Sequence, residues 1–182
     1  DTYRNNNNML RLASRQIAAD YAAEFEQMFG GRFGTSKRSA TPRPAARVGA
    51  ARVEVYFSPE DGVVQHVLDR IAAAQRSIRF MAFSYTSAEI ADAMIGRARA
   101  GVSVRGVAEA QNATGSRAAY GPLKAAGIDV LQDGNCYILH HKVIIIDDRT
   151  VITGSYNFTA SAELSNDENL VIVDDPALAR AY

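Results

Sequence analysis

The sequence predicts an α/β sandwich built on a mixed β-sheet, and three observations support this fold class. From Val53 onward, short apolar segments typical of strands alternate with segments whose apolar residues follow helical spacing. Two apolar strands separated by a polar turn then occupy residues 142–153, which predicts an antiparallel hairpin after the parallel part of the sheet. The 182 residues are 47% apolar and 22% charged, so the chain can enclose a substantial core.

The expected elements follow one another regularly from the first of these strands, Val53–Phe57. The next residues, Ser58-Pro59-Glu60-Asp61, resemble a capping box with proline at the first helical position, so a helix should begin there. Two more helices are expected at 86–100 and 117–126. The remaining strands are expected at 78–83, 102–108, 128–131, 142–146, 151–153 and 169–173.

Before this regular part, the sequence predicts a helix that Ser14 caps and that ends at Gly30-Gly31. Four apolar residues repeat in it at helical spacing: Ile17, Tyr21, Phe25 and Met28. Such a stripe should be the packing face of the helix.

The two ends of the chain resemble each other. Asn5–Tyr21 aligns without gaps with Asn166–Tyr182. The aligned segments share four identical residues, which in the first segment are Asn5, Asn8, Ala18 and Tyr21. The alignment predicts a strand at Met9–Leu12 and places Asn7 at the position of Glu168. We interpret the two segments as the same element of two repeats.

This repeat divides the chain into three parts. Residues 1–30 are interpreted as the strand–helix tail of a preceding repeat, and residues 52–182 as the main domain. Residues 31–51, rich in Arg, Ser, Pro and Gly, are interpreted as a basic linker between them. The cations of this linker, Lys37 among them, should be solvated, and contact with a phosphate or a nucleic acid is the alternative.

The residues with chemical function surround the predicted hairpin. Because side chains alternate along a strand, His140 and Lys142 should share one face while His141 points to the other. Ser155 and Asn157 have the same spacing after the second strand. An imidazole, an ammonium, a hydroxyl and an amide should therefore converge at one end of the sheet, where they could hold and attack a tetrahedral anion.

The pattern His-x-Lys-x4-Asp-x6-Gly-Ser-x-Asn at residues 140–157 resembles the HKD signature of the phospholipase D superfamily. The later Asn166-Asp167-Glu168-Asn169 is similar to the downstream acidic segment of its small endonuclease members. The resemblance covers about residues 53–173, and it implies that residues 52–182 form a phospholipase D-like α-β-α sandwich with a mixed β-sheet.

The resemblance also implies a mechanism and a role for each residue. One HKD histidine attacks phosphorus and forms a phosphohistidine, while another protonates the leaving alcohol. His140 would take one of these roles, and Lys142 and Asn157 would bind the non-bridging oxygens of the phosphate. Ser155 would help to orient the phosphate. Glu168 would accept a hydrogen bond from the far nitrogen of the His140 ring and fix its tautomer.

Two motif residues are assigned structural roles. Gly154 belongs to the turn that precedes Ser155, and Asp147 closes the motif strand, whose length carries it away from His140. A metal site is not expected, because His140 and His141 face opposite ways and Lys142 cannot act as a ligand. The resemblance implies no cofactor.

The reaction needs two HKD histidines, and this chain supplies one. Its three histidines are His66, His140 and His141, and His66 lies in a predicted helix outside any HKD pattern. A second HKD half is therefore the expected partner. It would be either a lost N-terminal repeat, which the alignment of the two chain ends favours, or a homodimer partner.

The motif implies recognition of a phosphodiester but does not indicate which class of molecule contains it. Zero net charge favours a phospholipid slightly over a nucleic acid, whereas the likeness of residues 78–86 and of Glu168 to the small endonucleases favours a nucleic acid. A third possibility is an inactive half-domain that needs a second HKD half. No apolar run reaches the length of a transmembrane segment, so a soluble protein is expected, with secretion or a periplasmic location left open.

Overall fold

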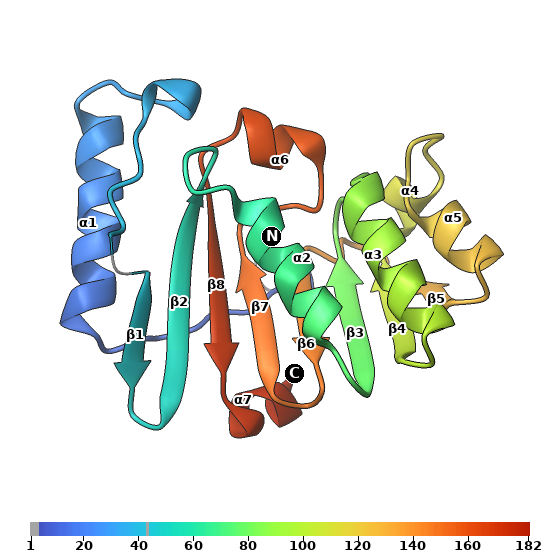
Figure 1. Ribbon diagram of the computed structural model, residues 1–182. Helices are drawn as coiled ribbons and strands as arrows, with labels where there is room; N and C mark the ends of the chain where they lie inside the picture. Colours follow the sequence, from blue (N-terminus) through green and yellow to red (C-terminus); the bar gives the residue numbers. More distant parts are fainter. Residues whose placement is uncertain (1–3, 43) are drawn as a thin grey trace.

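The computed structural model describes residues 4–42 and 44–182 and contains an eight-stranded mixed sheet with the order β1-β2-β8-β7-β6-β3-β4-β5 (Figure 1). The strands are β1 (Ala45–Val48), β2 (Ala51–Ser58), β3 (Ser77–Ala82), β4 (Ser103–Ala108), β5 (Asp129–Gln132), β6 (Lys142–Ile146), β7 (Thr150–Gly154) and β8 (Glu168–Asp174). The helices are α1 (Arg15–Phe29), α2 (Val63–Ala73), α3 (Ala88–Arg99), α4 (Ala110–Ala113), α5 (Tyr120–Ala125), α6 (Ala160–Leu164) and α7 (Pro176–Ala181), with a short 3-10 turn at Gly34–Ser36. The predicted α/β class with a mixed sheet is confirmed.

The sheet has a parallel part and an antiparallel part that meet at β3. Strand β3 pairs in parallel with β4, which pairs in parallel with β5. On its other side β3 is antiparallel to β6, and the antiparallel pairing continues through β7 and β8 to β2. The predicted hairpin is thus β6–β7, at the centre of the sheet.

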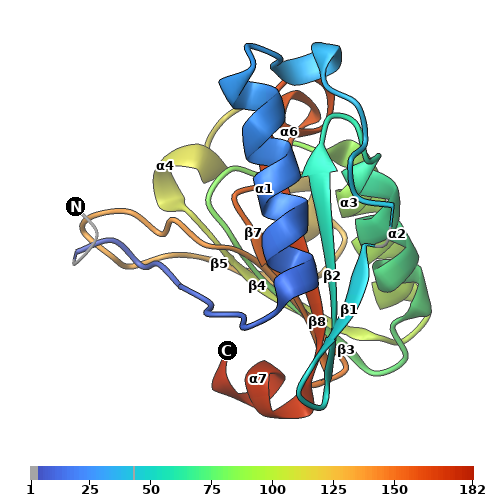
Figure 2. The ribbon, with the colours of Figure 1, turned by 90° about the vertical axis from the view of Figure 1, so that its left-hand side faces the viewer.

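Helices cover both faces of the sheet, and the two faces are built from alternate residues of the central strands. Helices α2 and α3 lie on one face, and α1 and α7 lie on the other (Figures 1 and 2). Ile144 belongs to the core beneath α2 and α3, whereas its neighbours Val143 and Ile145 belong to the core beneath α7. Each fully buried aliphatic side chain of this kind contributes about 1.5–3 kcal/mol, which explains why β6 is continuously apolar.

Side chains cap helices α1, α3 and α7, but the capping box predicted at residues 58–61 does not begin a helix. The hydroxyl of Ser14 caps α1 and that of Ser87 caps α3, each accepting a hydrogen bond from a backbone N–H three residues later. The carboxylate of Asp175 caps α7 in the same way. Helix α2, however, begins at Val63 and not at Pro59. The reason is that the carboxylate of Asp61 binds the backbone N–H of Phe57 instead of capping a helix.

The predicted strand at Met9–Leu12 is wrong. Residues 7–14 are extended without a strand ladder, and Asn6 forms a single parallel bridge with Leu139. Strand β8, the counterpart in the alignment of the two chain ends, has β2 and β7 as neighbours, and no such neighbours flank residues 9–12. The cap and the helix expected after the strand are present as Ser14 and α1. The interpretation of residues 1–30 as the tail of a preceding repeat stays a prediction.

Helix α1 buries polar side chains and exposes apolar ones. Ile17 is buried as expected, but Asp20, Glu24 and Gln27 are the other residues that face the protein. Two aromatic side chains lie on the exposed side, Phe25 and Phe29, whereas the ring of Tyr21 packs edge-on against buried Phe57. The prediction that the apolar stripe is the packing face of α1 therefore holds for Ile17 and is wrong for Phe25, which is 54% exposed.

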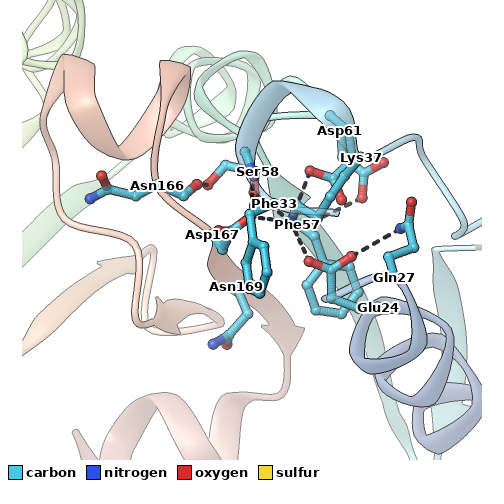
Figure 3. A network of polar contacts seen from close by, with 12 residues as sticks. Glu24, Gln27, Phe33, Lys37, Phe57, Ser58, Asp61, Asn166, Asp167 and Asn169 are labelled. Atoms are coloured by element: carbon cyan, nitrogen blue, oxygen red, sulfur yellow. Dashed lines mark hydrogen bonds and ion pairs between the residues drawn. The ribbon is translucent and has the colours of Figure 1, made fainter. Parts of the chain in front are cut away.

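A buried lysine explains the polar packing face of α1 (Figure 3). The side chain of Lys37 is fully buried, and its ammonium forms ion pairs with Glu24 of α1, with Glu60 at 3.1 Å and with Asp167 at 3.0 Å. It also donates a hydrogen bond to the carbonyl oxygen of Ser58 at 3.1 Å. Burial alone would lower the pKa of Lys37, but the hydrogen bonds with the carboxylates outweigh it and leave the pKa raised. We name this group the Lys37 network.

The Lys37 network corrects the expectation that Lys37 is solvated, whereas the interpretation of residues 31–51 as a linker between repeats stays a prediction. Lys37 is at the centre of a buried ion-pair cluster, because α1 supplies one carboxylate and the segments around β2 and β8 supply the others. Residues Ala45–Val48 form β1, which pairs with β2 at the edge of the sheet. This part of the chain therefore fixes α1 to the domain and extends the sheet.

Candidate active site

Five residues predicted to form the site line one open cavity of about 720 Å³. They come from the end of the sheet where β6 and β8 begin and β7 ends. These residues are His140, Lys142, Ser155, Asn157 and Glu168. His141 does not line the cavity, in agreement with the alternation of side chains along the strand.

Lys142 is the cation of this cavity. Its side chain is nearly buried, its ammonium donates to the carbonyl oxygen of His140 at 2.8 Å, and it lies 4.8 Å from the ring centroid of Phe83. Burial lowers the pKa of Lys142 to about 8, although the nearby carboxylate of Glu168 acts in the opposite direction. Lys142 is therefore charged at neutral pH and loses its proton at mildly alkaline pH.

This titration predicts how anion binding depends on pH. Above about pH 8 the ammonium of Lys142 becomes neutral, so we expect the affinity for sulfate, whose own charge is constant, to fall about tenfold between about pH 7 and pH 9. Isothermal calorimetry with sulfate measures this change. The Lys142→Arg variant is the control, because its guanidinium stays charged and its affinity should be flat over this range. An equal fall in both proteins would contradict the assignment.

The ring of His140 is held by the N-terminal segment of the chain. Its Nδ1 lies 3.2 Å from Oδ1 of Asn7, and its ring centroid lies 4.7 Å from that of Phe83. Burial, together with the charge of Lys142, lowers the pKa of His140. The imidazole is therefore neutral at pH 7, the state in which it can attack an electrophile or accept a proton.

Glu168 lines the cavity at the start of β8 but has a different neighbour from the one predicted. Its carboxylate accepts a hydrogen bond from Nδ2 of Asn166 at 3.1 Å. The hydrogen-bond partner of the His140 ring is Asn7, so the tautomer-fixing contact that the resemblance implied for Glu168 is occupied by another residue. The carboxylate of Glu168 instead acts on the charge of Lys142.

The turn after β7 places an amide and a hydroxyl in the cavity. Oγ of Ser155 accepts hydrogen bonds from the backbone N–H and from Nδ2 of Asn169, at 3.0 and 3.2 Å, which leaves its own proton free to donate. Oδ1 of Asn157 is buried without a hydrogen-bond partner within the described chain. An amide oxygen only accepts hydrogen bonds, so Oδ1 would need a donor, and the Nδ2 group of Asn157 is the candidate contact for a bound oxyanion.

Gly154 is required by a close approach of two backbones. A Cβ at this position, where φ is +152°, would lie 2.2 Å from the carbonyl oxygen of Asn169. This approach lets the N–H groups of Ser155 and Tyr156 donate to the same oxygen at 3.1 and 3.2 Å. The glycine thus fixes the turn that carries Ser155 and Asn157.

Asp147 lies at the far end of β6, away from the cavity. Its carboxylate accepts hydrogen bonds from the backbone N–H groups of three consecutive residues at distances of 2.7–2.9 Å: Gln75, Arg76 and Ser77. Burial alone would raise the pKa of Asp147, but these hydrogen bonds outweigh it and lower the pKa. The motif aspartate joins the hairpin turn to the start of β3 and does not reach the site.

The N-terminal part of the chain brings to the cavity residues that the sequence pattern did not predict. Asn7, Asn8 and Tyr21 line it together with the β8 residue Asn169. The hydroxyl of Tyr21 donates to Oδ1 of Asn169 at 3.1 Å. The alignment of the two chain ends was the available signal, because it marks both asparagine-rich segments as counterparts.

Two further properties of the described residues concern metal clusters and membrane-spanning helices. Within the part of the chain that the structure describes, no group of three or more His, Cys, Asp or Glu side chains is arranged to hold a metal ion. Among residues 4–42 and 44–182, no helix combines the length and the apolar character needed to cross a membrane.

Comparisons with known proteins find several similar sequences. Residues 67–182 match the family model described as cardiolipin synthase, PLD-like domain. A phospholipase D of Rickettsia conorii is 36% identical over 137 residues, which are 75% of this chain and 68% of that protein. A mitochondrial cardiolipin hydrolase of Xenopus laevis is 34% identical over 122 residues, 67% of this chain and 58% of that protein.

A solved structure is similar to this chain in both fold and sequence. The phospholipase D family member Nuc from Salmonella typhimurium superposes with a TM-score of 0.66 and 38% identity, covering 72% of this chain and 88% of that one. The family model matches more than half of the chain and includes His140, Lys142, Ser155, Asn157 and Glu168. The chain belongs to the phospholipase D superfamily.

Proposed function

We propose that this chain is the catalytic half of a phosphodiesterase that cleaves or transfers its substrate through a phosphohistidine intermediate. The observation that carries the proposal is the cavity in which a neutral imidazole, a buried ammonium and the amide of Asn157 meet. An ammonium and an amide can bind the non-bridging oxygens of a phosphodiester and stabilise the charge of its transition state. The imidazole supplies the group that attacks or transfers a proton.

The reaction takes place in two steps that use two histidines. In the first step one histidine forms a bond to phosphorus, the bond to the leaving oxygen breaks, and the second histidine gives its proton to that oxygen. In the second step the second histidine removes a proton from water or from another alcohol, whose oxygen then displaces the first histidine. The second histidine comes from another HKD half, either a preceding repeat or a second copy of the chain.

We propose a phospholipid as the substrate, because one wall of the cavity is apolar. Leu10, Leu12 and Ile17 from the N-terminal part line the cavity together with Val171 of β8, close to the groups that would bind the phosphodiester. A phospholipid offers a phosphodiester and apolar chains side by side. The names of the relatives, phospholipase D and mitochondrial cardiolipin hydrolase, support the same substrate class.

Cleavage of DNA or RNA without a metal is the second candidate. The half-exposed ring of Tyr21 lines the cavity and could stack on a nucleobase beside the phosphodiester. The cavity contacts themselves recognise a phosphodiester whatever its substituents. An inactive half-domain that needs a second HKD half is the third candidate.

Turnover of two substrates by the same protein separates these candidates. We expect vesicles of phosphatidylcholine and cardiolipin to be hydrolysed with release of the headgroup or of phosphatidic acid, and single-stranded DNA to stay intact. Mass spectrometry after acid-free quenching should find a phosphorylated histidine. The His140→Gln variant measures the background.

The opposite pattern, cleavage of DNA without lipid turnover, would establish the nuclease instead. No turnover and no phosphohistidine with either substrate would contradict an active chain and support the inactive half-domain.

A further inference from the structure

The contact between Asn7 and His140 has a counterpart within the same chain. In the alignment of the two chain ends, Asn7 occupies the position of Glu168. Both residues line the active-site cavity, one from each end of the chain. The N-terminal segment therefore presents to His140 the residue that corresponds to Glu168, with an amide in place of the carboxylate.

Asn7 is fixed in place by its neighbours on both sides. Before it, Asn6 donates its backbone N–H to the carbonyl oxygen of Ile138 at 2.9 Å and accepts the backbone N–H of His140 at 3.0 Å. After it, Asn8 donates to Oγ1 of Thr153 at 3.1 Å and accepts from the ring of His141 at 2.9 Å. The side chain between these two anchors is aimed at His140, so its contact with the ring is a built feature of the site.

The chemistry of an amide oxygen determines which nitrogen of His140 can react. A carbonyl oxygen only accepts hydrogen bonds, so Nδ1 must carry the proton when it binds Oδ1 of Asn7. In the neutral ring Nε2 then holds the lone pair. A phosphodiester bound by Lys142 and Asn157 in the cavity would meet this nucleophilic nitrogen.

The charges around the ring favour the same state. The titratable groups near His140 are the ammonium of Lys142 and the carboxylate of Glu168, which line the same cavity, and the imidazole of the adjacent His141, which lies outside it. The pKa of His140 is lowered by burial and by Lys142, and the amide of Asn7 adds no negative charge that would reverse this. A carboxylate at the same place would stabilise the imidazolium, which cannot attack phosphorus.

We propose that Asn7 is a positioning residue that holds His140 as the nucleophile, while Glu168 plays the corresponding part for the histidine of the other HKD half and favours its protonated, proton-donating form. This proposal rests on the proposed function and assigns the roles of nucleophile and proton donor to the two histidines. Nε2 of His140 bonds to phosphorus as the bond to the leaving oxygen breaks, and the proton on the other histidine passes to that oxygen. That histidine then takes a proton from water, whose oxygen displaces Nε2 and restores neutral His140.

Histidine titration by NMR tests the positioning role without any need for turnover. In the Asn7→Asp variant we expect the pKa of His140 to rise by about one unit, because a carboxylate would lie within hydrogen-bond distance of Nδ1. In the Asn7→Ala variant we expect the nitrogen shifts of the ring to move toward the Nε2–H tautomer. The Asn8→Asp variant is the matched control, because it should raise the pKa of His141 and leave that of His140 within about 0.3 units.

Two results would overturn the proposal. One is an unchanged pKa of His140 in Asn7→Asp while Asn8→Asp raises that of His141. The other is substrate turnover in which the phosphorylated residue lies outside His140. If the NMR shifts occur as expected but neither lipid nor DNA is turned over, the positioning contact stands and the proposed function fails, so the two failures are distinguishable.

Discussion

Replacing His140 with glutamine is expected to lower kcat/KM for the phosphodiester by at least about a thousandfold. Glutamine keeps a polar side chain of similar size, but it can neither form a bond to phosphorus nor transfer a proton at neutral pH. The loss corresponds to about 4 kcal/mol of transition-state stabilisation. Steady-state kinetics on the substrate that the wild-type protein turns over measures it.

The chain offers a matched control for this experiment. His141 has the same side chain and is the next residue, but it lies outside the cavity. We expect His141→Gln to retain kcat/KM within about threefold, since only the contact with Asn8 is changed. Equal losses in the two variants would show that the effect comes from folding or from the N-terminal segment and not from the reacting group.

Replacing Lys37 with methionine is expected to lower the free energy of unfolding by about 3–5 kcal/mol. The ammonium of Lys37 compensates the carboxylates of Glu24, Glu60 and Asp167. Methionine fills a similar volume but leaves the carboxylates of Glu24 and Glu60 buried without their cation. Chemical denaturation at pH 7 measures the loss.

The pH dependence of the stability loss and a control variant at an exposed neighbouring residue test whether the buried ion pairs cause the loss. Burial raises the pKa of Glu60, so protonation on going toward about pH 4 should relieve part of the repulsion and shrink the effect of Lys37→Met. Arg38, the next residue, is exposed, and Arg38→Met should change stability by less than about 0.5 kcal/mol. A loss below about 1 kcal/mol in Lys37→Met would contradict a stabilising role for the network.

The central sheet could be predicted because its signals are local. Strands β6, β7 and β8 are apolar runs bounded by polar turns, and the short turn between β6 and β7 makes these two strands neighbours in a hairpin. Met9–Leu12 is apolar at three of its four positions, yet it forms no strand, because strand formation also needs a neighbouring sheet edge. Helix α2 begins later than the sequence predicts, also because of a tertiary contact: the carboxylate of Asp61 binds the backbone N–H of Phe57 and not the end of a helix.

The site could be predicted only where neighbouring strands supply it. His140, Lys142, Ser155 and Asn157 belong to one hairpin, so the period of the strand places them together. The contact between Asn7 and His140 joins residues that are far apart in the chain, and no periodicity encodes such a contact. The burial of Lys37 is equally non-local, because its partners lie on three separate segments.

The Lys37 network also bears on how the protein opens when it fluctuates. If α1 detached alone, Lys37 or Glu24 would have to leave the cluster, and the charges of the remaining groups would no longer be compensated. Local opening of α1 is therefore coupled to opening of the segment that carries Asp167 and, next to it, Glu168. Helix α1, which lies outside the residues matched by the family model, thus belongs to the same cooperative unit as an edge of the active site. Protected amides in α1 should therefore exchange their hydrogens at the same rate as those of the first residues of β8.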